Sequence, residues 1–241
     1  MSLLELRHAN KSFRGLHAVQ DASLEVPENG IVGLIGPNGA GKTTLFNLVA
    51  GALAPDSGEI LFGGRPIHGL RPHQVCAAGI GRTFQVVKPF SGLTVLDNVI
   101  VGGLHRESSV QKARAVSLGI LRKLNLEEKA NLPASALTLP DRKRLEVARA
   151  LATRPRLLLL DEVMAGLRPT ECDQMIGVFR ELNRSEGLAI LLIEHVMRAV
   201  MALAHGIVVL HHGEVIAQGT PEQVVRNAAV LECYLGEEAE V

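Results

Sequence analysis

The chain has 241 residues, 47% of them hydrophobic, and its 25 basic residues balance its 25 acidic residues. This length is enough to bury a sizeable core in one elaborated domain, and the balanced charge excludes a global field that would draw the protein onto nucleic acid or anionic lipid. The cysteines 76, 172 and 233 lie far apart, which argues against a disulfide framework or a zinc site, and no apolar run approaches the ~18–20 residues of a membrane span.

The N-terminal segment alternates apolar and polar residues. Leu4 and Leu6 alternate with charged residues, and Leu24 and Val26 repeat the pattern. A period of two predicts half-buried strands, so we expect an antiparallel β region before the core. Phe13 lies between these strands in a chain that is only 3% aromatic. Two roles are open for its ring, which are packing in the core, as for most phenylalanines, and stacking on a nucleotide base.

A P-loop follows this region. The apolar run Ile31–Ile35 predicts a buried strand, and the spacing of Leu45, Leu48 and Val49 predicts a helix. The loop between them, a Walker A sequence, consists of Gly36, Pro37, Asn38, Gly39, Ala40, Gly41, Lys42, Thr43 and Thr44. Because a P-loop connects a strand to a helix, sequence and context together predict a site for a nucleoside triphosphate.

Each residue type in the P-loop has a chemical task. Glycines at 36, 39 and 41 allow backbone angles that turn successive N–H groups toward phosphate oxygens. The helix N-terminus behind the loop adds a favourable dipole. Lys42 supplies a positive charge for the β- and γ-phosphates, and the Thr43 hydroxyl is suited to coordinate Mg²⁺. We therefore predict ATP and Mg²⁺ as the ligands of this site.

The middle of the chain changes from strand to helix patterns. Residues 80–84 read as a strand that ends at Gln85. An amide at a strand end can reach a metal ion or its water, although a lone glutamine is usually a surface residue. From Thr94 to about Leu132 the apolar residues take helical spacing. This pattern predicts an all-helical insertion that forms a second lobe.

Two further buried strands end in functional residues. The run Leu157–Leu160 leads into Asp161 and Glu162, as in a Walker B strand. There the aspartate holds Mg²⁺ through water and the glutamate polarises the attacking water. A second apolar run, residues 188–193, leads to His195. Because ligands of a parallel sheet lie beyond the carboxyl ends of its strands, we expect His195 on the same edge as the P-loop.

In this order the motifs resemble those of the ATP-binding subunit of an ABC transporter, over essentially the whole chain. The correspondence covers the aromatic A-loop position (Phe13), Walker A, the Q-loop (Gln85), Walker B with its glutamate, the D-loop (165–168) and the switch histidine (His195). Several motif sequences are similar to those of the ATPases of branched-chain amino acid importers. They are Walker A, Arg-Thr-Phe-Gln, Ile-Glu-His and Tyr-Leu-Gly-Glu at 234–237. Relatives that carry urea, amides or aromatic acids share this wording.

The resemblance implies an α/β fold, a P-loop NTPase whose mostly parallel sheet carries an N-terminal antiparallel β region and an inserted helical subdomain. It implies one domain, 1–241, with a core of 1–85 and about 155–241 and a helical part of about 90–154. It also assigns base stacking to Phe13, a Mg²⁺ or water contact and a link to the permease to Gln85, and a γ-phosphate contact to His195.

The resemblance further implies the partners. Two ATPase subunits sandwich two ATP molecules, each P-loop closed by the signature sequence of the other subunit, and closure moves two membrane permease subunits. A secreted or periplasmic solute-binding protein delivers the solute, which never touches this subunit. We therefore expect a peripheral protein at the cytoplasmic face of the inner membrane.

The signature segment departs from the family pattern. It falls at residues 137–141, where Thr138 keeps a hydroxyl for the opposing nucleotide but Pro140 stands at a glycine position. Proline has no backbone N–H, so this signature offers the opposing phosphate one donor fewer than a glycine would. Asp141 adds negative charge, which disfavours a phosphate. We expect a heterodimer in which a second ATPase supplies an intact signature. If Pro140 is only an N1 helix starter, a homodimer remains open.

Two other classes of protein fit the sequence less well. A soluble ABC-type ATPase that acts on nucleic acid or ribosomes usually has two cassettes or a long coiled-coil arm, and this chain has neither. A P-loop GTPase would carry an Asn-Lys-x-Asp motif, which the sequence lacks. We therefore predict an importer ATPase with no nucleic-acid partner.

Overall fold

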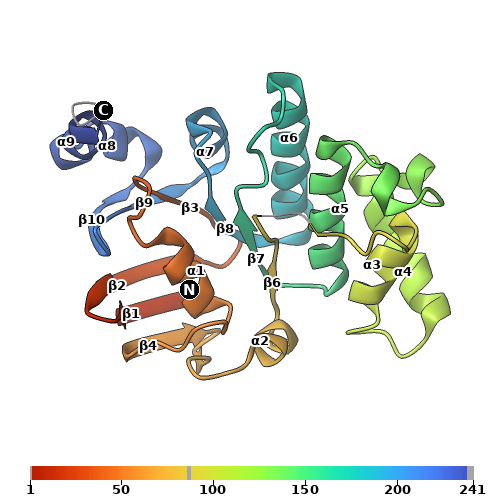
Figure 1. Cartoon of the computed structure of the whole chain (residues 1–241), viewed down its shortest axis with the longest axis horizontal. Helices are drawn as coiled ribbons and strands as arrows, with labels where there is room; N and C mark the ends of the chain where they lie inside the picture. The colour runs from red at the N-terminus through yellow and green to blue at the C-terminus, as the bar shows by residue number, and fades with distance from the viewer. Residues whose placement is uncertain (1, 86–87, 238–241) are drawn as a thin grey trace.

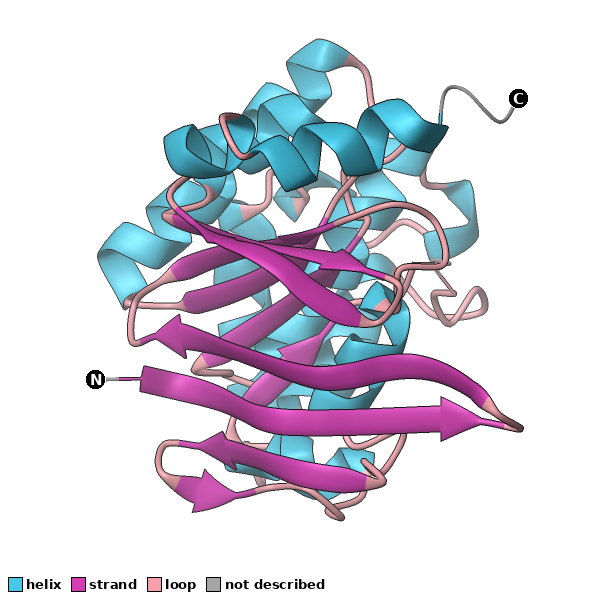
Figure 2. Ribbon diagram, turned by 90° about the vertical axis from the view of Figure 1, so that its left-hand side faces the viewer, coloured by secondary structure: helices cyan, strands magenta, loops and turns pink. Residues whose placement is uncertain are grey.

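The computed structural model describes residues 2–85 and 88–237, which form two β-sheets surrounded by helices (Figure 1). The smaller sheet is antiparallel, as the alternation of its residues predicts, and the long β1–β2 hairpin dominates it (Figure 2). Its strands, in spatial order, are β2 (Leu16–Pro27), β1 (Ser2–Phe13), β4 (Ser57–Phe62) and β5 (Arg65–Pro66). The N-terminal antiparallel region is thus confirmed.

The larger sheet has six strands and is parallel except at one edge, where β10 pairs with β9 in the antiparallel sense. Its strands, in spatial order, are β10 (Glu214–Gly219), β9 (Gly206–His211), β3 (Ile31–Ile35), β8 (Ala189–Ile193), β7 (Leu157–Asp161) and β6 (Ile80–Arg82). The P-loop strand β3 is therefore central, and the mixed α/β class is confirmed.

One strand boundary differs from its prediction. The strand predicted over residues 80–84 ends at Arg82. The next residue, Thr83, is fully buried, and its hydroxyl accepts the backbone N–H of Asp161 at 3.1 Å. A side chain here takes the place of a ladder carbonyl, so regular pairing with β7 stops.

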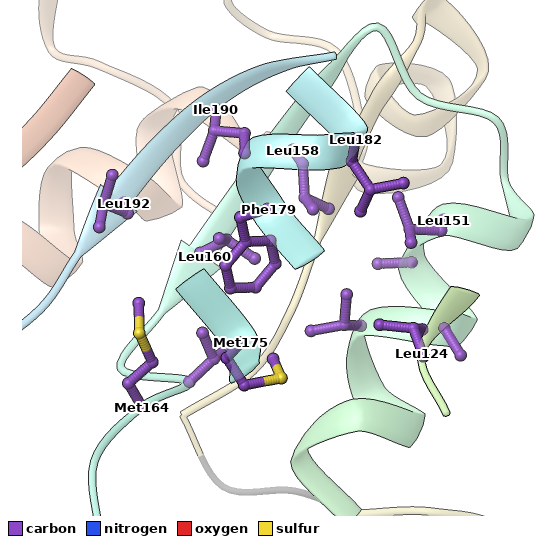
Figure 3. Packing of buried hydrophobic residues seen from close by; sticks show 14 of the residues in the cluster. Leu124, Leu151, Leu158, Leu160, Met164, Met175, Phe179, Leu182, Ile190 and Leu192 are labelled. Carbon is purple, nitrogen blue, oxygen red and sulfur yellow. The ribbon is translucent and has the colours of Figure 1, made fainter. Parts of the chain in front are cut away.

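The central strands β3, β8 and β7 of the large sheet are buried on both faces, as the continuous apolar run in β7 predicts. Leu157 and Leu159 face a cluster that includes the hairpin and helix α1 (Lys42–Val49), whereas Leu158 and Leu160 face a second cluster under α6 (Pro169–Glu186). Figure 3 shows part of the second cluster, in which side chains of α6 such as Phe179 gather over β7 and β8. These two packed faces fix the strand ends that carry the site.

Helices α3, α4 and α5 stand together at one end of the molecule (Figure 1). Thr94 begins the first of them by accepting the backbone N–H of Asp97, so the predicted helical insertion is present. The remaining helices are α2 (Pro72–Ala78), α3 (Val95–Gly103), α4 (Val110–Lys123), α5 (Leu139–Ala152), α7 (Met197–Leu203), α8 (Pro221–Val225) and α9 (Ala228–Glu237). Two 3-10 turns, Glu127–Lys129 and Ala134–Ala136, precede α5.

Across the described ranges, none of the helices is long and apolar enough to cross a membrane. Among the cysteines, Cys172 and Cys233 are buried packing residues and Cys76 is half-buried. The predicted single domain over 1–241 includes residues 1, 86–87 and 238–241, which lie outside the described residues.

Candidate active site

The P-loop joins β3 to α1 in a conformation that requires glycine. Gly36 has φ +146°, and a Cβ there would lie 2.0 Å from the carbonyl oxygen of Leu210. Gly41, the N-cap of α1, has φ +100°, and a Cβ there would lie 2.2 Å from the carbonyl oxygen of Ala18. Neither position has room for a side chain, so both glycines are needed for the loop to close over the sheet edge.

The P-loop lysine and threonine differ in burial. Lys42 is buried, and its Nζ donates to the carbonyl oxygens of Gly36 and Pro37, both at 2.6 Å. Thr43 is exposed in the first turn of α1. The ammonium thus lies inside the loop, where it would meet phosphate oxygens, while the hydroxyl faces the cavity.

A cavity of about 680 Å³ lies over the P-loop and collects residues from six separate segments of the chain. The predicted site residues that line it are Phe13, Asn38, Gly39, Ala40, Gly41, Lys42, Thr43, Thr44, Gln85, Glu162 and His195. The remaining lining includes Leu16, His17, Gln20 and His212. This volume suits a nucleotide-sized ligand. The other predicted site residues, Gly36, Pro37, Thr138 and Asp161, are not among its lining residues.

Phe13 lies at the end of β1, beside the hairpin turn, and is 42% exposed. Its ring faces the ammonium of Lys11, whose Nζ is 5.7 Å from the ring centre. The core role left open for this ring is therefore wrong, and an exposed aromatic face at the cavity wall fits a base.

Asp161 ends β7 and is 2% exposed. Its Oδ2 accepts from Nη2 of Arg82 at 3.2 Å, and Arg82 also donates to Oδ1 of Asn47 at 2.7 Å. Burial raises the pKa of the Asp161 carboxyl above its ordinary value, and the Arg82 guanidinium opposes that rise. Sequence reasoning missed Arg82, because nothing in the strand pattern distinguishes an arginine at its end.

The residues present fit Mg²⁺. Oδ1 of Asp161 is buried and has no hydrogen-bond partner within the described part of the chain, so this oxygen can serve a ligand. The structure contains no group of three or more His, Cys, Asp or Glu among its described residues that could hold a metal by themselves. Mg²⁺ is typically bound by one or two carboxylates together with substrate phosphates and water.

Glu162 follows Asp161 and has the left-handed backbone angle φ +50°. Its carboxylate is held from two sides, because Nε2 of Gln85 donates to Oε2 at 2.8 Å and Nε2 of His195 lies 3.0 Å from Oε1. A carboxylate only accepts hydrogen bonds, so Nε2 of His195 carries a proton in this contact. The three predicted residues at the ends of β6, β7 and β8 thus converge, as the sheet topology requires.

A second acid near the site was not foreseen. Glu194 is 1% exposed, and its Oε1 accepts the backbone N–H of Met164 at 2.8 Å. Burial raises the pKa of Glu194 to about 7, although the bond from Met164 opposes the rise. The Glu-His pair at 194–195 drew attention to the histidine alone, because a glutamate at a strand end gives no sign of being buried.

The signature segment lies at the start of α5. Thr138 is the N-cap, and its hydroxyl donates to Oδ2 of Asp141 at 2.8 Å. Pro140 is the second residue of the helix, so it does not begin α5 as an N1 residue. The buried Asp141 also pairs with Lys129 and, at 3.7 Å, with Arg144. The negative charge expected to repel phosphate is therefore matched by two cations.

The family model described as "ABC transporter" matches residues 19–165, from the second strand through Walker B. The chain belongs to this family. A second model, described as "Branched-chain amino acid ATP-binding cassette transporter", matches residues 214–240. As an ABC-type ATP-binding subunit, the protein binds and hydrolyses ATP, and the P-loop NTPase fold is confirmed.

Individual relatives extend over the whole chain. The high-affinity branched-chain amino acid transport ATP-binding protein BraF of Pseudomonas aeruginosa is 38% identical, covering 98% of both chains. The lipopolysaccharide export system ATP-binding protein LptB of Haemophilus influenzae is 36% identical, covering 99% of both. A crystal structure of an ATP-binding cassette of an ABC transporter in its ADP conformation superposes with a TM-score of 0.89 at 29% identity, covering 98% of this chain and 99% of that one.

Proposed function

We propose that this ABC ATPase drives an importer that takes up branched-chain amino acids or a related small polar solute. The observation that carries this proposal is the match of residues 214–240 to the branched-chain cassette model. This segment contains β10, α8 and α9, which lie at the opposite end of the molecule from the helical lobe (Figure 1). It therefore adds information beyond the general ATPase motifs.

The site residues divide the work of ATP hydrolysis. Lys42 binds the β- and γ-phosphates, and the P-loop N–H groups share their charge. Thr43 and Asp161 would hold Mg²⁺, with Gln85 reaching the ion or its water, and the ion would supply neutralisation of phosphate charge. Glu162 accepts the proton of the attacking water, since its carboxylate lines the cavity. His195 contacts Glu162 and lines the same cavity, where its ring would contact the γ-phosphate.

The partners follow from what one chain lacks. The cavity over the P-loop is not enclosed by this chain, so a second ATPase subunit would have to cover the nucleotide from outside. Pro140 supplies no N–H in the first turn of α5, which favours a different second ATPase, that is, a heterodimer. Membrane permease subunits would carry the motion, and a solute-binding protein outside the membrane would deliver the solute. The chain itself would act at the cytoplasmic face of the inner membrane.

Reconstitution tests the proposal. The chain, its companion ATPase and the permeases encoded nearby are placed in proteoliposomes, and uptake of labelled leucine, urea and an aromatic acid is measured with and without the solute-binding protein. ATP-dependent uptake of one solute supports the importer. Failure of the chain to assemble with any permease overturns it.

A second candidate is an exporter ATPase, which the 36% identity to LptB favours. The same proteoliposomes distinguish the two. In an exporter, the solute-binding protein would not stimulate ATP hydrolysis and no solute would enter. Stimulation of hydrolysis by the loaded binding protein would exclude the exporter.

A further inference from the structure

The loop after β7 holds its first residue in an unfavourable backbone conformation. Glu162 has φ +50°, in the left-handed region that is unfavourable for a non-glycine residue. Such a conformation persists only where neighbouring groups enforce it. On one side, the N–H of Glu162 donates to the carbonyl oxygen of Ile193 at 2.9 Å. On the other side, the carbonyl oxygen of Glu162 accepts the N–H of Ala165 at 3.3 Å, within the same turn, and a shorter bond from outside the turn.

The shorter bond comes from Lys143, a residue of helix α5. Its Nζ donates to the carbonyl oxygen of Glu162 at 2.8 Å, and only 6% of the residue is exposed. A buried ammonium loses its hydration, so a lysine in this position is retained only where compensating contacts exist. The bond therefore holds the backbone of Glu162 from the side of helix α5, while Glu162 lines the cavity.

The charges around Lys143 explain why it tolerates burial. Its ammonium is close enough to lower the pKa values of Glu146, Asp161 and Glu194, which burial raises. Glu194 also accepts the N–H of Met164, two residues after Glu162. A buried lysine and a buried glutamate thus hold the two ends of one short turn, residues 162–164.

We propose that Lys143 is a positioning residue that holds Glu162 in the conformation needed for hydrolysis. The inference rests on the proposed role of Glu162 as the base. Lys143 lies five residues after the N-cap Thr138 on the same helix. It therefore connects the helix that would cover the other subunit's nucleotide to the catalytic glutamate of its own subunit, and ATP binding itself does not require it.

The test compares Lys143→Met, which keeps length but removes charge and donor, in the wild-type and in the Glu162→Gln background. We expect Lys143→Met to lower kcat by roughly 10- to 100-fold, as for a displaced catalytic group, with KM and the Kd for ATP changed by less than about twofold. When Glu162 is already Gln, we expect less than about twofold further loss, because no base remains to be positioned.

Two further variants separate positioning from stability. Val99→Ala, in the buried core of α3, destabilises the helical lobe without touching the loop and should leave kcat near wild type. If Lys143→Met does not fold, Lys143→Arg keeps the charge and displaces the donor, and the same two backgrounds are compared. If Lys143 has only a structural role, kcat should fall by the same factor in both backgrounds.

Each outcome decides the inference. A fall in kcat that disappears in the Glu162→Gln background supports it. A wild-type kcat for Lys143→Met, beside an inactive Glu162→Gln, overturns the inference alone, as does an equal loss in both backgrounds. A wild-type rate for Glu162→Gln overturns the proposed role of Glu162 and the inference with it.

Discussion

The P-loop edge of the large sheet and the first turn of α5 are both helix starts that the family pattern assigns to phosphate, yet they are built in opposite ways. At the edge, Gly41 caps α1 without a side chain, and the buried oxygens Oδ1 of Asp161 and Oε2 of Glu194 lack partners among the described residues. At α5, Thr138 and Asp141 satisfy each other, and two cations complete the charge balance.

This difference teaches where the ligand is needed. Unsatisfied buried acceptors cost free energy, so a site keeps them only where a ligand or a change of protonation supplies the missing partner. The P-loop edge is therefore incomplete without its ligand. The start of α5 is complete as a helix cap, with Pro140 removing one donor.

Lys42→Ala removes the ammonium that lies inside the P-loop. We expect kcat/KM for ATP to fall by roughly 10³-fold, because one charged donor to the phosphates is lost from both the bound and the transition state. Nucleotide binding by fluorescence and steady-state hydrolysis measure this effect. Lys112→Ala, at an exposed position of α4, is the matched control. Wild-type binding and turnover in Lys42→Ala would contradict the assignment.

Glu162→Gln keeps the size of the side chain and its contact positions but removes the base. We expect hydrolysis to fall by roughly 10²–10³-fold, within the range for general base catalysis, while ATP remains bound. Hydrolysis is measured in a single turnover and binding by filter retention of labelled ATP. The idea fails if this variant hydrolyses ATP normally, since the base would then lie elsewhere.

The sequence pattern predicted the functional residues at the sheet edge. It did not predict the cations that contact them. Parallel strands bring their carboxyl ends to one edge, so Asp161, Glu162 and His195 could be grouped from sequence alone. Arg82 and Lys143 could not, because each is a single cation whose partner lies 79 or 19 residues away. A contact of this kind follows from tertiary packing and leaves no periodic pattern.

The signature segment was predicted less completely for the same reason. Its position and its proline are visible in the sequence, and the helix does begin there. The effect of Asp141 was misjudged as a free negative charge, because its partner Lys129 comes from a different turn of the lobe. The missing N–H of Pro140 can therefore be predicted from local sequence, whereas the pairing of Asp141 with Lys129 cannot.

Pro140→Gly restores the missing N–H in the first turn of α5. A hydrogen bond to a charged group contributes about 1.5–3 kcal/mol at best, and glycine costs a helix about 1 kcal/mol. We therefore expect the ATPase rate of the chain alone to rise by roughly 3- to 10-fold, with little change when the companion ATPase is present. Pro221→Gly, the same change at the start of α8, is the control. No rise in the chain alone would show that this signature is not impaired.

Glu194 tests the P-loop edge through stability. Its folded pKa is about 7, against an ordinary value of 4.5. Between these values the folded carboxyl holds a proton that the unfolded chain releases, so its contribution to the free energy of unfolding falls as pH rises, by up to about 1.4 kcal/mol per pH unit. Above pH 7 the penalty of burying the charge is fully present.

Glu194→Gln removes that penalty and keeps the acceptor for the N–H of Met164. We expect the variant to gain stability over wild type between pH 5 and pH 8, by roughly 1–3 kcal/mol, and to differ little at pH 5. Urea unfolding at pH 5, 6, 7 and 8 measures the difference, with Glu232→Gln at an exposed position as the control. If Glu194→Gln follows the wild-type pH dependence as Glu232→Gln does, the pKa of Glu194 is not raised on folding. The carboxyl would then be charged in the folded protein at neutral pH.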